Sequence, residues 1–168
     1  MKSTTIVTVL FLAFLVMVNV WIILTGSTPW FVSSLNILFH EAGHVIFGLF
    51  GHFIGVLGGT LGELLVPMLI VGYFWRRAQY AGQAFGLWWL GLALYDVSVY
   101  ASDARAQRLE LIGGPGGHDW FYLLGHTRLL DYDQTVGKLL VIAALFATVY
   151  SGVMIYRYWQ GQQGRIIS

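Results

Sequence analysis

The pattern of hydrophobic and polar positions along the chain is dominated by long, nearly uncharged apolar stretches. They occupy residues 6–25, about 30–50, 61–75, 85–100 and 139–156. A helix needs about 20 predominantly apolar residues to cross a bilayer, and the first stretch alone supplies twenty. The pattern therefore predicts an all-α membrane protein, a polytopic bundle of about four to five transmembrane helices.

Glycines interrupt this pattern after the second apolar stretch. The interrupting residues are Gly48, Gly51, Gly55, Gly58 and Gly59. Because glycine weakens a helix interior, we expect one membrane segment to be broken or re-entrant here, beside protein or a water-filled cavity. The next helix would begin near Leu61, where Glu63 is expected chiefly to complement the helix dipole.

The one sizeable polar excursion is the loop at residues 102–134, between the last two membrane segments. Its glycine-rich run at residues 113–117 predicts a hinge, and Asp119 is placed to begin a short amphipathic helix. We expect residues 1–168 to form a single multi-pass integral membrane domain, in the lipid bilayer of a bacterial inner membrane. Lysine and arginine are divided almost evenly between the two sides, so they do not predict its orientation.

Composition strengthens the membrane prediction and excludes several classes of function. The chain is 57% hydrophobic and 10% charged, with a mean hydropathy of +0.70. A net charge of +1 without a basic stripe argues against nucleic acid as a partner. The sequence has no cysteine, which excludes disulfides and thiolate metal sites, so any metal must be bound by His, Asp or Glu.

Candidate chemistry is concentrated in the sequence His40-Glu41-Ala42-Gly43-His44, within the second apolar stretch. Helical residues four apart lie on one face, so both imidazoles can bind one cation while Glu41 points to the side. Ionisable side chains within a membrane are costly and need compensation, which a metal supplies. We expect one Zn²⁺ per chain, bound by His40 and His44, with Glu41 as the catalytic base.

A catalytic zinc site usually has three protein ligands and leaves a fourth position open. The candidates for the third ligand are Glu63, Asp96, Asp103, His118, Asp119, His126 and, less readily, His52. We favour His118, because the glycine hinge would let its loop fold back over the site. Asp119 would then cap the helix, orient the imidazole or replace His118 as the ligand. The simpler interpretations are a solvent-exposed His118 and an Asp103 paired with an arginine at the membrane surface.

The intramembrane HEAGH sequence, the glycine-rich stretch after it and the later acidic element resemble the site-2-protease-type intramembrane zinc metallopeptidases, particularly their small bacterial members. In that family the two histidines bind zinc, the glutamate is the base, and an aspartate from a later transmembrane segment completes the metal shell. The resemblance implies His40 and His44 as ligands, Glu41 as base and Asp119 as the nearest counterpart of the aspartate. The family's Asn-Pro approach to an Asp-Gly pair is absent, and the specific match covers about a third of the chain.

The resemblance implies a zinc metalloendopeptidase that hydrolyses a peptide bond in or near the membrane segment of a protein substrate. The alternative is a non-catalytic subunit, with or without metal, of a larger membrane protein complex. An electron-transfer haem protein is disfavoured, because His40 and His44 on one helical face cannot flank one haem from opposite sides.

Overall fold

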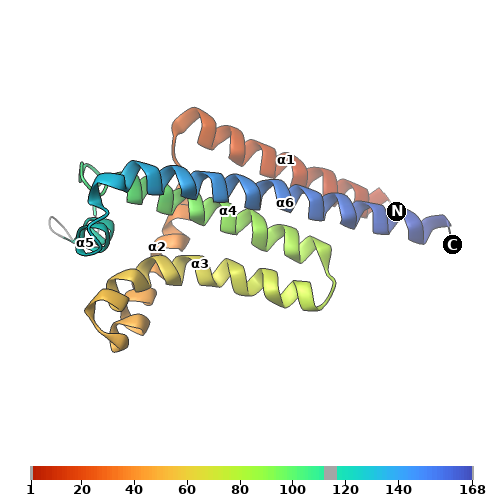
Figure 1. The fold of residues 1–168 in the computed structure, drawn as a ribbon. Coiled ribbons are helices and arrows are strands. Elements are labelled where there is room, and N and C mark those ends of the chain that lie inside the picture. The colour runs from red at the N-terminus through yellow and green to blue at the C-terminus, as the bar shows by residue number, and fades with distance from the viewer. Residues whose placement is uncertain (1, 112–116, 168) are drawn as a thin grey trace.

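The computed structural model describes residues 2–111 and 117–167, and all the regular elements in these ranges are helical. Figure 1 shows the long helices α1, α4 and α6 lying lengthwise in the molecule, with α1 beginning and α6 ending at the same end. The elements are α1 (Lys2–Thr25), α2 (Trp30–Phe47), η1 (Gly48–Phe50), α3 (His52–Arg76), α4 (Tyr80–Ser102), α5 (Asp119–His126), η2 (Leu130–Tyr132) and α6 (Asp133–Ile167).

The most extensive helix pairing joins α4 to α6. Gly91 and Gly137 lie in this interface, where an added Cβ would collide with Thr148 and Ser102, so small residues let the two backbones approach. The Arg105 guanidinium donates to the Asp133 carboxylate at 2.7 Å and ties the loop after α4 to the start of α6. Around this pair the buried apolar core comprises Leu15, Val18, Val32, Ala84, Leu87, Trp88, Trp89, Leu92, Met154 and Ile155.

Several of the predicted membrane-length helices are present in the described residues. In the described residues, three stretches are long and apolar enough to cross a membrane: His52–Arg76, Tyr80–Ser102 and Leu130–Gln162. Two further segments, Val9–Thr25 and Trp30–Phe50, are long and apolar enough to cross a membrane only when they are taken together. The chain bends by 87° between them, as in a broken span or a re-entrant loop. The described residues thus contain three such helices, or four if the bent pair forms one span, against the predicted four to five. A sharp bend precedes Trp30, and the predicted break after the second apolar stretch is also present, at Gly48–Gly51.

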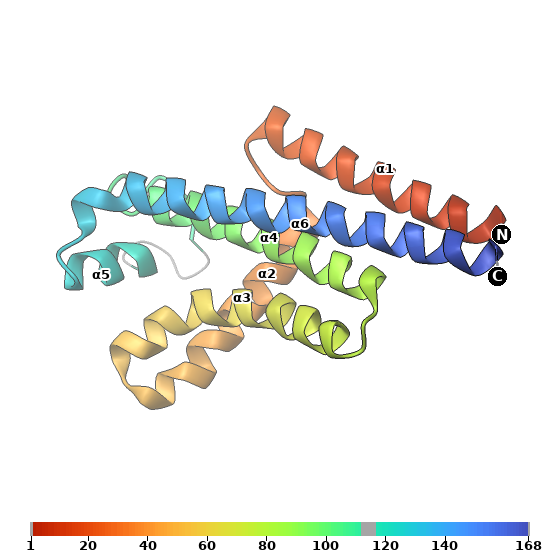
Figure 2. The same cartoon turned by 45° about the vertical axis from the view of Figure 1, so that its right-hand side comes forward.

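Two of the later glycines, Gly48 and Gly51, lie at the break between α2 and α3, whereas Gly55, Gly58 and Gly59 lie inside α3 and let it pack closely against neighbouring groups. The backbone leaves the helical path only around η1 and Gly51, whose φ of 102° suits glycine. From His52 onward α3 is continuous, so the predicted start near Leu61 is wrong. A Cβ added to Gly58 would lie 2.7 Å from the carbonyl oxygen of Gly43, which shows how closely α2 and α3 approach each other. Figure 2 shows these two helices lying next to each other.

The polar loop contains the short amphipathic helix that the sequence predicted, now seen as α5. It begins at Asp119, but the capping residue is His118, whose Nδ1 accepts a hydrogen bond from the Phe121 backbone N–H at 3.2 Å. The expectation that Asp119 caps this helix is therefore corrected. The predicted glycine hinge lies mostly in residues 112–116, outside the described residues.

Candidate metal centre

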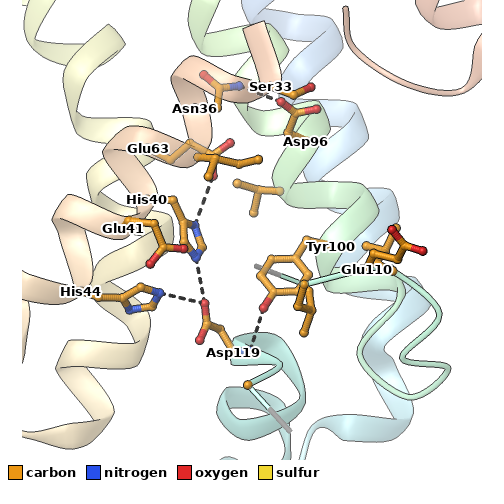
Figure 3. Close-up of a pocket in the computed structure, with 15 residues that line it drawn as sticks. Ser33, Asn36, His40, Glu41, His44, Glu63, Asp96, Tyr100, Glu110 and Asp119 are labelled. Carbon is orange, nitrogen blue, oxygen red and sulfur yellow. Dashed lines mark hydrogen bonds and ion pairs between the residues drawn. The ribbon is translucent and has the colours of Figure 1, made fainter. Parts of the chain in front are cut away.

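His40 and His44 lie one turn apart on α2, and their ring centroids are 4.8 Å apart. Both Nε2 atoms face the same carboxylate oxygen of Asp119, at 2.8 Å from His40 and 3.1 Å from His44. One ligand atom from each of these three residues lies within 4.8 Å of the others. Figure 3 shows the two imidazoles and the carboxylate converging from α2 and α5.

Asp119 reaches this position because the first turn of α5 is attached to α4. The Asp119 backbone N–H donates to the Tyr100 hydroxyl at 2.9 Å. At the other end of the helix, His52 and Phe53 of α3 pack against the rings of Tyr122 and His126. Contacts with two long helices thus place a carboxylate from a distant segment beside the histidine pair.

The hydrogen bonds of His44 fix the tautomer that a metal ligand requires. Its Nδ1 lies 2.9 Å from the Gly55 carbonyl oxygen, which can only accept, so Nδ1 carries the proton. In the neutral imidazole, Nε2 then presents a lone pair to the Asp119 carboxylate. Two acceptors facing each other at 3.1 Å are unfavourable unless the imidazole is protonated or a cation lies between them.

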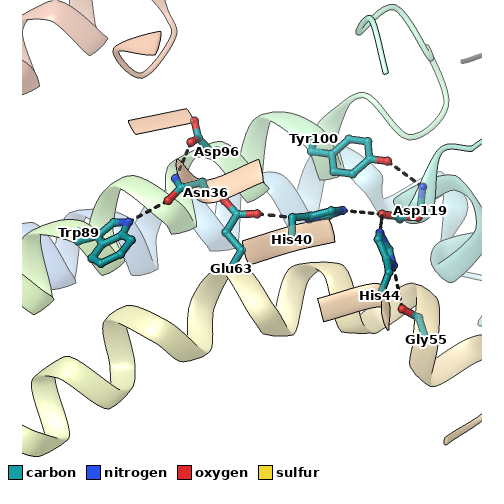
Figure 4. A network of polar contacts seen from close by, with 9 residues as sticks. All are labelled: Asn36, His40, His44, Gly55, Glu63, Trp89, Asp96, Tyr100 and Asp119. Atoms are coloured by element: carbon teal, nitrogen blue, oxygen red, sulfur yellow. Dashed lines mark hydrogen bonds and ion pairs between the residues drawn. The ribbon is translucent and has the colours of Figure 1, made fainter. Parts of the chain in front are cut away.

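His40 is oriented in the same way by a buried carboxylate. Its Nδ1 lies 3.5 Å from Glu63 Oε2, on the side of the ring opposite Asp119. Figure 4 shows the resulting line from Glu63 through His40 to Asp119. A carboxylate behind a histidine is the usual partner of a metal-binding imidazole, because it fixes the tautomer and makes the ring more basic. Glu63 is only 6% exposed and lies well inside α3, which corrects its expected role at a helix start.

These donors fit a zinc ion. Zinc prefers tetrahedral nitrogen and oxygen ligands at about 2.0–2.2 Å, which places the ligand atoms roughly 3.3–3.6 Å from one another. The contacts of Asp119 with His40 and His44, at 2.8 and 3.1 Å, are a few tenths of an ångström shorter than this spacing. Small side-chain movements would therefore suffice for coordination.

The structure brings Asp119, rather than His118, to the histidine pair. His118 is buried, at 3% exposed, and its Nε2 lies 3.5 Å from Asp103 Oδ2 while Nδ1 caps α5. Burial lowers the pKa of the His118 imidazole. The interpretation of His118 as a solvent-exposed loop residue is thus wrong.

The other third-ligand candidates have separate partners. Asp103 accepts from the backbone N–H groups of Arg108 and Leu109 and lies near His118, and among the described residues the predicted pair with an arginine side chain is not found. Asp96 accepts from Thr28 and Asn36, in a buried network nearer the start of α2. His52 and His126 take part in the contact between α3 and α5.

A cavity of about 340 Å³ opens beside the histidine pair. His40, His44 and Asp119 line it, together with Glu41, which follows His40 on α2. Glu41 thus faces the same cavity as the two histidines and Asp119.

Sequence reasoning missed the positioning roles of Tyr100 and Gly55, and gave Glu63 only a minor chance of a place at the site. Tyr100 and Gly55 act through contacts between segments distant in the sequence, which spacing along one helix does not reveal. The available signal was the placement of ionisable and hydroxyl groups inside apolar stretches, where such groups need partners.

Comparison with protein-family models, with curated proteins and with solved structures finds no match to this chain. The chemistry of the site therefore rests on its own geometry.

Proposed function

We propose that the protein is an integral membrane zinc metalloendopeptidase, which hydrolyses a peptide bond in or near the membrane segment of a protein substrate. The observation that carries this proposal is the convergence of His40, His44 and Asp119 on one point of a cavity that Glu41 also lines. The long apolar helices α3, α4 and α6 support insertion into a membrane, which we propose is a bacterial inner membrane.

In this proposal His40, His44 and Asp119 hold the metal, and Glu63 and the Gly55 carbonyl keep the two imidazoles oriented. Zinc held there would supply Lewis-acid polarisation of the scissile carbonyl. The Glu41 carboxylate takes a proton from the attacking water as the water oxygen bonds to the carbonyl carbon. It then returns a proton to the leaving amine as the C–N bond breaks. No covalent bond to the protein forms.

The decisive variant is Glu41→Gln, which removes the base without changing a proposed ligand. We expect it to retain one zinc per chain but to lose about 10²–10⁴-fold in cleavage rate, the usual contribution of a general base. Zinc would be measured by elemental analysis of the purified protein. Cleavage would be measured by mass spectrometry on a panel of transmembrane-segment peptides in proteoliposomes.

Glu110→Gln is the matched control, because Glu110 also lines the cavity but is not next to a proposed ligand. It should leave cleavage within about twofold of the wild type, since exposed charges contribute little. Cleavage that survives Glu41→Gln would refute the role of Glu41. A zinc-loaded wild type that cleaves no peptide would instead favour a non-catalytic membrane subunit.

A further inference from the structure

A second hollow in the molecule, hereafter the α3 groove, is lined by residues of the segment 66–77, at the end of α3. It is an open groove of about 930 Å³, within the size range usual for small-molecule sites. None of its lining residues belongs to the proposed metal centre. The α3 groove is therefore a separate feature with its own ligand chemistry.

Two rows of side chains form the outward side of the α3 groove. Helical residues four apart lie one above the other on the same face, so each row follows the helix axis. Each row is apolar or uncharged over its first turn and ends in an arginine. The rows are Met68, Gly72 and Arg76, and Leu69, Tyr73 and Arg77.

Gly72 makes the notch in this surface. A Cβ added to Gly72 would meet nothing within 4 Å, so the space above its backbone is open. The neighbouring apolar side chains face outward, with Met68 42% and Leu69 68% exposed. On the inner side, Val66 and Ile70 pack against the buried core, which gives the groove a fixed wall. This apolar hollow fits a hydrocarbon chain.

The charge of the α3 groove is entirely positive. Arg76 and Arg77 are the only charged residues that line it. The arginine ion pairs of the described residues belong to Arg105, and neither Arg76 nor Arg77 forms one. The Arg77 guanidinium carbon lies 4.7 Å from the centroid of the Tyr73 ring, a cation–π contact that holds Arg77 beside the groove. Two arginines without a carboxylate are complementary to an anion, and the guanidinium fork matches phosphate oxygens.

The arginines lie where a bilayer would place its phosphates. The stretch His52–Arg76 is long and apolar enough to cross a membrane, so Arg76 marks one end of a candidate span. Exposed aromatic side chains, which are enriched at membrane–water interfaces, occur at the same level in Tyr73 and Trp75. Trp75 also stacks against Tyr150 of α6. Figure 1 shows this end of α3 beside the turn into α4.

We propose that the α3 groove binds one anionic phospholipid. Its phosphate accepts hydrogen bonds from Arg76 and Arg77, and an acyl chain lies in the notch at Gly72. An anionic lipid is preferred to a zwitterionic one, because the groove has two positive charges and no negative charge to pair with an ammonium headgroup. The lipid site rests on the membrane location proposed above, but it requires neither zinc nor peptide hydrolysis.

The test measures lipid binding by native mass spectrometry of the purified full-length protein, released from detergent micelles. Dioleoyl phosphatidylglycerol and dioleoyl phosphatidylcholine, which share their acyl chains, would be titrated separately. We expect phosphatidylglycerol to bind at least about fivefold more tightly, as the attraction of basic residues for anionic lipids implies. Inorganic phosphate at the same concentration should not displace it, because phosphate lacks an acyl chain.

The variants separate the charge of the groove from its shape. Arg76→Gln and Arg77→Gln should each weaken phosphatidylglycerol binding about fivefold, and the double variant about 25-fold. Gly72→Leu keeps both arginines but fills the notch, so it should weaken binding at least about fivefold. Arg157→Gln is the matched control, because Arg157 is an exposed arginine of α6 outside the groove, and it should change the Kd less than about twofold.

Equal binding of the two lipids by the wild type would overturn the proposal without recourse to any variant. So would a double arginine variant that loses no more affinity than Arg157→Gln, or unchanged binding in Gly72→Leu. Displacement by inorganic phosphate would identify a free anion as the occupant and overturn the lipid site.

These outcomes are separable from the peptidase test, because lipid binding is measured without zinc or substrate. A preference for phosphatidylglycerol in a protein that cleaves no peptide would support the lipid site and refute only the proposed reaction. Cleavage without this preference would do the reverse.

Discussion

At the scale of single residues, each proposed ligand is held by a partner on its far side. Glu63 contacts His40, the Gly55 carbonyl contacts His44, and the Tyr100 hydroxyl contacts the backbone of Asp119. Such contacts reduce the freedom that each ligand loses when it binds a metal, and removing them typically costs 10- to 100-fold in metal affinity. His40 and His44 belong to one helix, whereas Asp119 comes from α5, a segment distant in the sequence. The position of Asp119 therefore depends on how α5 packs against the rest of the protein.

The choice between Asp119 and its neighbour can be tested by two alanine variants. Asp119→Ala should weaken zinc binding more than about 100-fold, which exceeds the effect of losing a supporting group alone. His118→Ala should weaken it by no more than about tenfold, because it removes a helix cap worth about 1 kcal/mol. Competition with a chromophoric chelator would measure both affinities.

His126→Ala is the control, because it changes a histidine of α5 that is neither a proposed ligand nor the helix cap. Its zinc affinity should stay within about tenfold of the wild type. The reverse ranking, with zinc lost in His118→Ala and retained in Asp119→Ala, would identify His118 as the ligand.

At the scale of helices, the sequence predicted the elements but not all of their contacts. The spacing of His40 and His44 placed both on one face of α2, and the helix after Asp119 is present as α5. The start of α3 was misplaced because a glycine-rich run has two physical meanings. Glycine weakens an isolated helix, but it also allows two helices to pack at short range, and only the position of α2 decides between them.

The seam between α2 and α3 provides a prediction at this scale. A Cβ at Gly43 would lie 2.8 Å from the carbonyl carbon of Gly58, so Gly43→Ala must push the helices apart. We expect a loss of about 1–3 kcal/mol in unfolding free energy, as for other overpacked sites. Zinc affinity should fall as well, because α3 supplies both Glu63 and the Gly55 carbonyl. Denaturant titration in detergent micelles would measure the stability.

Gly72→Ala is the matched control, since an added Cβ there meets nothing within 4 Å. It should stabilise α3 by about 0.5–1 kcal/mol, because alanine loses less conformational entropy in a helix interior. Equal effects of the two variants would show that the seam is not closely packed.

At the scale of the whole molecule, helix length and polarity predict which loops share a side of the membrane. Gln79, between α3 and α4, and Asp131, before α6, lie at opposite ends of apolar helices. These 168 residues contain no cysteine, so single cysteine variants can be labelled without background from them. In sealed vesicles, an impermeant maleimide should label Gln79→Cys and Asp131→Cys from opposite sides.

Gln160→Cys, near the far end of α6, is the control for this experiment and should be labelled from the same side as Gln79→Cys. Labelling of Gln79→Cys and Asp131→Cys from one side would show that α4 does not cross the membrane.

The attachment of α5 has a thermodynamic consequence for the whole chain. Metal binding and docking of α5 share one residue, Asp119, so each must strengthen the other by the same free energy. An ion bound by His40, His44 and Asp119 would act as a cross-link between α2 and α5, which are far apart in the sequence. The zinc-loaded protein should therefore be more resistant to opening of its polar loop than the metal-free protein, by an amount that rises with the free zinc concentration.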